Sequence, residues 1–214
     1  MSLYALQTGS IEVVQLLTTV GVVQRRVTMH GVHEALLEAQ AAALGLPLSR
    51  LYLPEDVDMP TYRQQMDQQY AALLAQGIRY AVFGDLHLAD LKAYREEALD
   101  AVGMQGIFPL WQQPVQALSA RFLALGFKAV VVCVNARVLD RRFVGRPYDA
   151  QFLADLPEGV DCCGENGEFH TVVYDGPLFS QSVDFRLGEV VHRHYSTEDK
   201  THDTGFYFQE LLQP

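Results

Sequence analysis

Two carboxylates stand on a short glycine-containing stretch, Gly164-Glu165-Asn166-Gly167-Glu168, directly before a run of β-prone residues. Glycine adopts positive φ angles easily, so Gly164 and Gly167 let a binding partner approach the backbone closely. A turn that feeds a strand is a common place for polar groups that meet a ligand. The same spacing is also typical of a tight turn whose carboxylates are solvated. The residues alone therefore leave a ligand site and a plain turn both open.

Two further stretches carry groups that suit ligand binding. Gly84-Asp85 follows a predicted strand over 78–83, and ligands of open α/β sheets bind outside the carboxyl ends of strands. The loop over 135–148 is cationic in a chain of net charge −10, and guanidinium forks suit phosphate or carboxylate ligands. A solvated loop is the default interpretation of such a run. Its arginines are Arg137, Arg141, Arg142 and Arg146.

The first half of the chain alternates between predicted strands and helices. Residues 1–9 read as the last turns of a helix that Gly9 ends, and Asp90 is placed to cap a later helix. This alternation predicts a parallel sheet with helices on its faces. The predicted strands cover 11–20, 49–53, 78–83 and 107–110, and the predicted helices cover 34–44, 60–77 and 90–102.

The second half has a different pattern. A helix starting at Pro114 is followed by a nearly continuous apolar run over 127–134, which predicts a strand buried on both sides. Short strands over 183–187 and 189–195 follow, separated by polar loops, and the tail ends in Gly205-Phe206-Tyr207-Phe208. Late helices are few, so the pattern of this half predicts an α+β fold. We expect two domains, 1–111 and 112–214. We also expect a cleft between them in which Glu168 lies near Gly84-Asp85.

Composition excludes several function classes. The net charge of −10 argues against a broad nucleic-acid surface, since phosphate neutralisation needs a basic face. Three cysteines without a C-x-x-C pair fit a reducing compartment, and we expect no metal site of the structural zinc type. We find no apolar run near the ~20 residues of a membrane span, and no signal peptide. We therefore expect a cytoplasmic protein without a nucleic-acid or membrane partner.

The stretch 164–171, Gly-Glu-Asn-Gly-Glu-Phe-His-Thr, with Asp-Gly-Pro-Leu-Phe at 175–179, resembles the C-terminal signature of the diphthine–ammonia ligase family. These are ATP-pyrophosphatase-type enzymes. Matching pieces at Met29–Val32, Gly84-Asp85 and Gly145-Arg146 stand in the same order, so the resemblance covers essentially the whole chain. Asn166 and His170 stand where archaeal and eukaryotic members more often have glycine and glutamate. That departure is typical of bacterial relatives.

The resemblance implies both a fold and a reaction. The fold is an α/β, parallel-sheet, HUP-like (adenine nucleotide alpha hydrolase-like) domain followed by a smaller α+β domain. The reaction is adenylation of a carboxylate by ATP with Mg²⁺, release of pyrophosphate, and attack by ammonia to give an amide. The partners implied are ammonia and a small-molecule or protein carboxylate. A carboxylate can position or deprotonate the incoming ammonium.

The resemblance also assigns roles to residues of this chain. Glu168 and Glu165 are the expected catalytic groups. We expect Glu168 to matter more, with little effect on stability, because it stands at the threshold of the strand. Gly84, Asp85 and His30 are the expected cofactor-binding residues. The expected substrate-binding residues are Gly164, Asn166, Gly167, His170, Thr171 and Arg146.

Members of the family begin with a strand and a Ser-Gly-Gly-Lys-Asp-Ser phosphate loop, and neither occurs in this sequence. We therefore expect the chain as written to be silent toward ATP. The alternative to a ligase is a non-catalytic nucleotide-binding module or scaffold. Without that first strand, the strands over 11–20 and 78–83 would expose unpaired backbone groups, which favours self-association as a homo-oligomer.

Overall fold

The first half of the chain alternates between helices and strands, as the sequence predicts. The computed structural model describes residues 1–7, 9, 11–27, 30–54, 56–195 and 204–213. The first helix ends at Leu6 and is capped by Gln7, so the predicted cap at Gly9 is wrong. The elements of this half are α1 (Ser2–Leu6), β1 (Leu16–Gly21), α2 (Glu34–Leu44), β2 (Leu48–Leu53), α3 (Met59–Ala75), β3 (Tyr80–Val82), α4 (Ala89–Val102) and β4 (Gln105–Ile107).

Local signals set the ends of these helices. The ring of His33 caps α2, and Gly45 ends it in the left-handed conformation with φ 68°. Asp58 caps α3 through its carboxylate. The prediction that Asp90 caps α4 is wrong, because Leu88 occupies the cap position. Asp90 instead lies in the first turn, where its negative charge still interacts favourably with the helix dipole.

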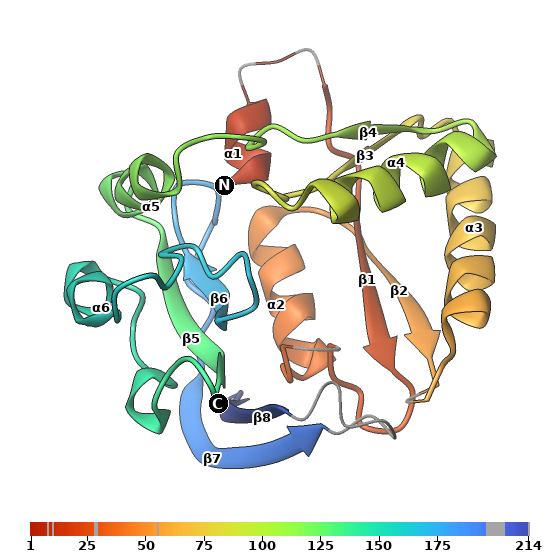
Figure 1. Ribbon diagram of the computed structural model, residues 1–214. Coiled ribbons are helices and arrows are strands. Elements are labelled where there is room, and N and C mark those ends of the chain that lie inside the picture. The colour runs from red at the N-terminus through yellow and green to blue at the C-terminus, as the bar shows by residue number, and fades with distance from the viewer. Residues whose placement is uncertain (8, 10, 28–29, 55, 196–203, 214) are drawn as a thin grey trace.

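The strands of this half are parallel, but they form two separate pairs. β1 pairs with β2, and β3 pairs with β4. Figure 1 shows β1 and β2 running down the molecule and β3 and β4 lying across its top. β3 has three residues and pairs only with β4, so no ladder joins it to β1 in the part of the chain that the structure describes. A single HUP-like parallel sheet is therefore not confirmed.

Two strand boundaries of this half also differ from expectation. β1 begins at Leu16 instead of residue 11, and β4 ends at Ile107 where the predicted strand begins. Both errors have one cause. Short apolar runs mark burial, and only backbone pairing decides which of their residues belong to a strand.

The second half forms a four-stranded antiparallel sheet in the order β6-β5-β8-β7. One strand occupies 186–195 where the sequence predicted two, and a register shift between Leu187 and Val190 marks the predicted break. The elements are α5 (Val115–Ala124), β5 (Lys128–Asn135), the 3-10 turn η1 (Arg141–Phe143), α6 (Ala150–Asp155), β6 (Phe169–Asp175), β7 (Arg186–Tyr195) and β8 (Thr204–Leu212).

β5 is buried on both faces, as its apolar run predicts. Successive side chains of a strand point to opposite faces. Val131 accordingly packs with Phe143 and Phe152, whereas Val130 packs with Leu36 of α2. Figure 1 shows α2 lying between this sheet and the β1–β2 pair. The two halves thus share a hydrophobic core, while the domain boundary at residue 111 stays a prediction.

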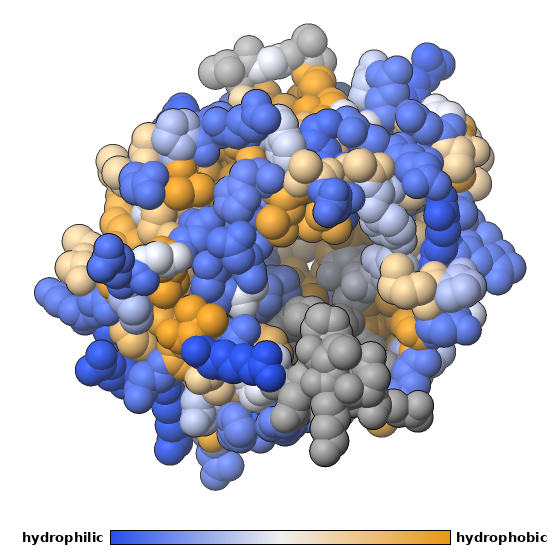
Figure 2. Space-filling view, viewed as in Figure 1, coloured by the Kyte–Doolittle hydropathy of each residue, from blue (hydrophilic) through white to orange (hydrophobic). Residues whose placement is uncertain are grey.

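The surface is mixed in polarity. Figure 2 shows polar residues over most of one face, smaller apolar patches, and a hollow near its centre. Among the described residues, no helix is both long enough and apolar enough to cross a membrane.

Candidate functional site

A cavity of about 190 Å³ lies where the segment after β3 meets α5, β6 and the glycine-containing turn. Its polar lining residues are few: Ser119, Tyr148, Cys163, Glu165 and Thr171. Ligand pockets are typically apolar with a few polar groups, and they span ~300–1,000 Å³. This cavity has that character at a smaller size, so it fits a group of a few atoms. The rest of its lining is Met1, Gly84, Leu86, Leu110, Leu118, Phe122 and Phe169.

Glu168 is hydrogen-bonded to other residues of the turn. Its side chain is buried, and its carboxylate accepts hydrogen bonds from three donors. These are the backbone N–H of Asp161 (3.1 Å), the backbone N–H of Asn166 (3.0 Å) and the side-chain amide of Asn166 (3.0 Å). A buried carboxylate needs such partners, because an unpaired charge away from water is costly. The geometry therefore gives Glu168 a positioning task within the turn.

Glu165 faces out of the turn toward the other half of the chain. Its Oε1 accepts a 2.7 Å hydrogen bond from the backbone N–H of Leu86, just beyond β3. Nearby, His87 Nε2 lies 2.9 Å from Asp161 Oδ2. Glu165 and Gly84 line the same cavity, so the turn and the carboxyl end of β3 meet, although through Glu165 and not through Glu168.

A buried tyrosine forms one wall of the cavity. The Tyr148 hydroxyl lies 2.8 Å from Ser119 Oγ and 2.8 Å from the carbonyl oxygen of Cys162, and it has one proton to donate between them. Burial raises the pKa of Tyr148 well above its usual range, so the group stays a neutral phenol. Tyr148 thereby connects α5 to the turn that carries Glu165.

Asp85 lies against Arg95 of α4. Asp85 Oδ2 and Arg95 Nε are 2.8 Å apart, and the guanidinium stacks over the ring of Phe83 at 4.5 Å. Neither of these two atoms makes a hydrogen bond of acceptable geometry. Asp85 and Arg95 therefore form an ion pair whose N–H group does not point directly at the carboxylate oxygen. The carboxylate of Asp85 is 8% exposed and is engaged by this cation.

The structure brings together two predicted binding residues that are far apart in the sequence. The rings of His30 and His170 are 4.6 Å apart between centroids and tilted by 44°. Burial and, secondarily, the nearby His30 lower the pKa of His170 to about 4, so its ring is neutral at pH 7. His170 and Thr171 are neighbours on β6 and point to opposite faces of the sheet, so only Thr171 lines the cavity. Met29, next to His30 in the predicted motif, lies outside the described residues.

Arg146 is engaged on the α6 side of the sheet. Its guanidinium pairs with Asp155 at 2.8 Å and stacks over the rings of Phe143 and Phe152, each 5.6 Å away. This hydrogen bond is the main cause of the lowered pKa of Asp155. Arg146 therefore lies among structural contacts, and its predicted role as a substrate ligand stays a prediction.

Sequence reasoning missed several residues of the site. His87 stands two positions after Asp85, and Asp161 directly precedes the two adjacent cysteines; both signals were present in the sequence. Ser119 and Tyr148 carry no such signal, since a serine within a helix and a tyrosine in a loop are ordinary. Only the packing of α5 against the turn reveals them.

Comparison with known proteins places these features in a family. Residues 115–207 match the profile of the diphthamide synthase C-terminal domain. That range contains α5, Tyr148, the turn and β6. The C-terminal half of the chain is therefore similar to diphthine–ammonia ligases. The resemblance of the 164–179 stretch to this family is thereby confirmed.

The similar proteins all carry the same name. Bovine (Bos taurus) diphthine–ammonia ligase is 31% identical over 110 residues, and the human (Homo sapiens) protein is 30% identical over 110 residues. These alignments cover 49% of this chain and 41% of each relative. The zebrafish (Danio rerio) diphthine–ammonia ligase is 27% identical over 178 residues, which cover 74% of this chain and 68% of that protein.

Proposed function

We propose that this chain is an ATP-dependent, amide-forming ligase of the diphthine–ammonia ligase type. A carboxylate would be activated as an acyl-adenylate with release of pyrophosphate, and ammonia would then attack the acyl carbon and displace AMP. The observation that carries this proposal is the hydrogen bond from Leu86 N–H to Glu165. This bond fixes a carboxylate from the family's signature on the wall of a small cavity beside Gly84.

Glu165 would act on the ammonia side of the reaction. Leu86 occupies only part of the acceptor capacity of its carboxylate, which offers about four lone-pair sites on two oxygens. The remaining sites can accept hydrogen bonds from ammonium. Attraction between opposite charges is stronger in a mostly apolar cavity than in water. The same carboxylate can take a proton from ammonium and so release the ammonia that attacks.

Thr171 and Gly84 would serve the acyl group. The Thr171 hydroxyl lines the same cavity and can donate to an oxygen on which negative charge develops during the attack. Gly84 contributes no side chain, which leaves room beside Glu165. The volume of about 190 Å³ admits the reacting end of a carboxylate together with ammonia, and the body of the substrate would lie outside.

Similarity to this family implies the use of ATP. When bound, ATP supplies the activation that turns a carboxylate into an electrophile. The cavity is too small for a nucleotide, and the carboxylate of Asp85 is engaged by Arg95. The cavity residues therefore do not fit ATP or Mg²⁺, which would have to bind outside this cavity. Gly84, Asp85 and His30 stay predictions as nucleotide contacts.

The proposal is tested by amide formation with purified protein. The reaction would contain ATP, Mg²⁺, ¹⁵N-ammonium and a panel of free and protein-bound carboxylates, with the amide detected by mass spectrometry. Glu165→Gln should lower ammonium-dependent amidation by about 10²-fold, the scale of general acid–base effects. Glu158→Gln, which changes an exposed carboxylate after α6, should leave the rate unchanged.

Hydroxylamine separates a proton acceptor from a merely structural residue. This nucleophile is already neutral at pH 7, so it needs no base, and it should restore the acyl-transfer rate of Glu165→Gln. If Glu165→Gln is equally slow with ammonium and with hydroxylamine, Glu165 does not act by accepting a proton. Absence of amide with every acid would instead favour the non-catalytic alternative.

A further inference from the structure

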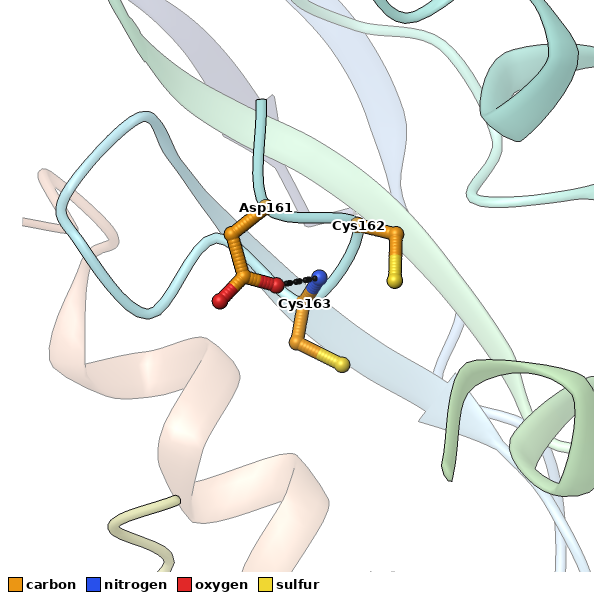
Figure 3. A group of neighbouring side chains, drawn as sticks. All are labelled: Asp161, Cys162 and Cys163. Carbon is orange, nitrogen blue, oxygen red and sulfur yellow. Dashed lines mark hydrogen bonds between the residues drawn. The ribbon is translucent and has the colours of Figure 1, made fainter. Parts of the chain in front are cut away.

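The turn before Gly164 brings together three side chains of the kinds that bind metal ions. A carboxylate oxygen of Asp161 and the sulfurs of Cys162 and Cys163 all lie within 4.8 Å of one another. Figure 3 shows both thiols pointing to the same side of the turn, with the Asp161 carboxylate beside Cys163. Thiolate and carboxylate are both established ligands of Zn²⁺.

The position of this group leaves room for a further ligand. Cys163 lines the cavity that also contains Glu165. Zinc sites with three protein ligands and one exchangeable water are the open type, whereas structural sites have four protein ligands. The lack of a C-x-x-C pair argues against the closed type only. An ion held by the three consecutive residues would have its fourth position toward the cavity.

Asp161 is already held in place by groups outside this set. One oxygen accepts a 2.7 Å hydrogen bond from the backbone N–H of Cys163, and the other lies 2.9 Å from His87 Nε2. Its side chain is only 6% exposed. Hydrogen bonds of this kind orient metal ligands and are a regular part of metal sites. His87 comes from the segment after β3, so two distant parts of the chain converge here.

The thiol of Cys163 already has a hydrogen-bond partner in the free protein. Cys163 donates to the carbonyl oxygen of Val115 at 3.5 Å, and burial, followed by its acidic neighbours, raises its pKa to about 12. Burial also raises the pKa of Cys162. Metal binding must then displace protons, so affinity will depend strongly on pH.

We propose that Asp161, Cys162 and Cys163 form a binding site for a soft divalent cation, with Zn²⁺ as the representative ion and its fourth position open to the cavity. Two thiolates on one tetrahedral Zn²⁺, with bonds of about 2.3 Å, are about 3.8 Å apart. The two sulfurs lie within 4.8 Å of each other, and rotation about the Cα–Cβ bonds can set them at this spacing. This site does not depend on the amide-forming function.

Cobalt(II) is a spectroscopic probe for the site. Titration of the reduced protein with Co²⁺ should give a thiolate-to-cobalt charge-transfer band that saturates at one ion per chain and is removed by Zn²⁺. Cys162→Ser and Cys163→Ser should each weaken or remove the band. Cys133→Ala is the matched control, because Cys133 is the third cysteine and lies buried in β5. It should keep the band. No band in the parent protein, or equal bands in all three variants, would overturn the proposal.

A second measurement uses the unaltered protein and so does not depend on whether the variants fold. Zn²⁺ added in weak buffer should release two protons per bound ion. Zn²⁺ affinity should rise by about 100-fold per pH unit, as expected for displacement of two protons. Zn²⁺ binding without proton release would place the ion on carboxylates elsewhere and would contradict the proposal.

Discussion

The carboxylate of Glu165 accepts a hydrogen bond of 2.7 Å from the backbone N–H of Leu86, 79 positions earlier in the chain. The contact between His87 and Asp161 lies beside it. Together they tie the turn of the family-matched domain to the segment that follows β3. The cavity between them therefore depends on both halves of the chain, and a change in either half will alter it.

Glu168→Gln should destabilise the fold. The amide cannot accept at both oxygen positions, so its NH₂ group would face an N–H of Asp161 or Asn166 that now donates to the carboxylate. Loss of hydrogen bonds to a buried charged group predicts a loss of about 1–3 kcal/mol in the free energy of unfolding, measured with urea. Glu158→Gln, at an exposed position, should be neutral. Unchanged stability with slower turnover would instead support the catalytic role expected for Glu168 and contradict a purely structural one.

Gly164→Ala should be far more damaging than Gly167→Ala. Both glycines have positive φ, 71° and 82°, so each alanine variant loses about 1 kcal/mol from backbone strain. At Gly164 an added Cβ would also lie 2.6 Å from the carbonyl oxygen of Phe169, whereas the space at Gly167 is open. We expect Gly164→Ala to lose more than about 2 kcal/mol, because backbone must move. Equal urea midpoints for the two variants would contradict this geometry.

Stability should fall on mild acidification because of His170. Its folded pKa of about 4 lies below the unfolded value of ~6.5, so the unfolded chain takes up the proton first. Stability is therefore lost as pH falls from about 6.5 toward 4. We expect His170→Gln to reduce the loss between pH 7 and pH 5 by about 1–2 kcal/mol. If the free energy of unfolding changes with pH in the same way for the parent and for His170→Gln, His170 is not the cause of the loss of stability.

Tyr148→Phe should lose about 1–2 kcal/mol in the free energy of unfolding. It removes a hydroxyl that has one proton to donate between Ser119 and the carbonyl of Cys162, so one of these acceptors loses its donor. Tyr80→Phe is the control, since Tyr80 is 47% exposed. If the two variants unfold at the same denaturant concentration, the hydroxyl of Tyr148 does not hold α5 to the turn.

Sequence patterns alone located most of the elements. Its alanine and leucine content and the stop at Gly45 predicted α2 with its observed bounds, 34–44, because those signals act within one helix turn. The double burial of β5 also followed from its unbroken apolar run. The glycine-containing turn was recognisable because its composition is unusual and matches a family motif.

Other features were decided by tertiary structure. The separation of β1–β2 from β3–β4 depends on backbone pairing between distant segments, which periodicity within a segment does not encode. The different directions of the Glu165 and Glu168 side chains have the same origin. Both carboxylates stand on one turn, and only the folded chain points Glu168 into three local N–H donors and Glu165 across to Leu86. A buried carboxylate must accept hydrogen bonds. The direction of such a side chain on a turn is therefore fixed by the N–H donors that the folded chain places near it.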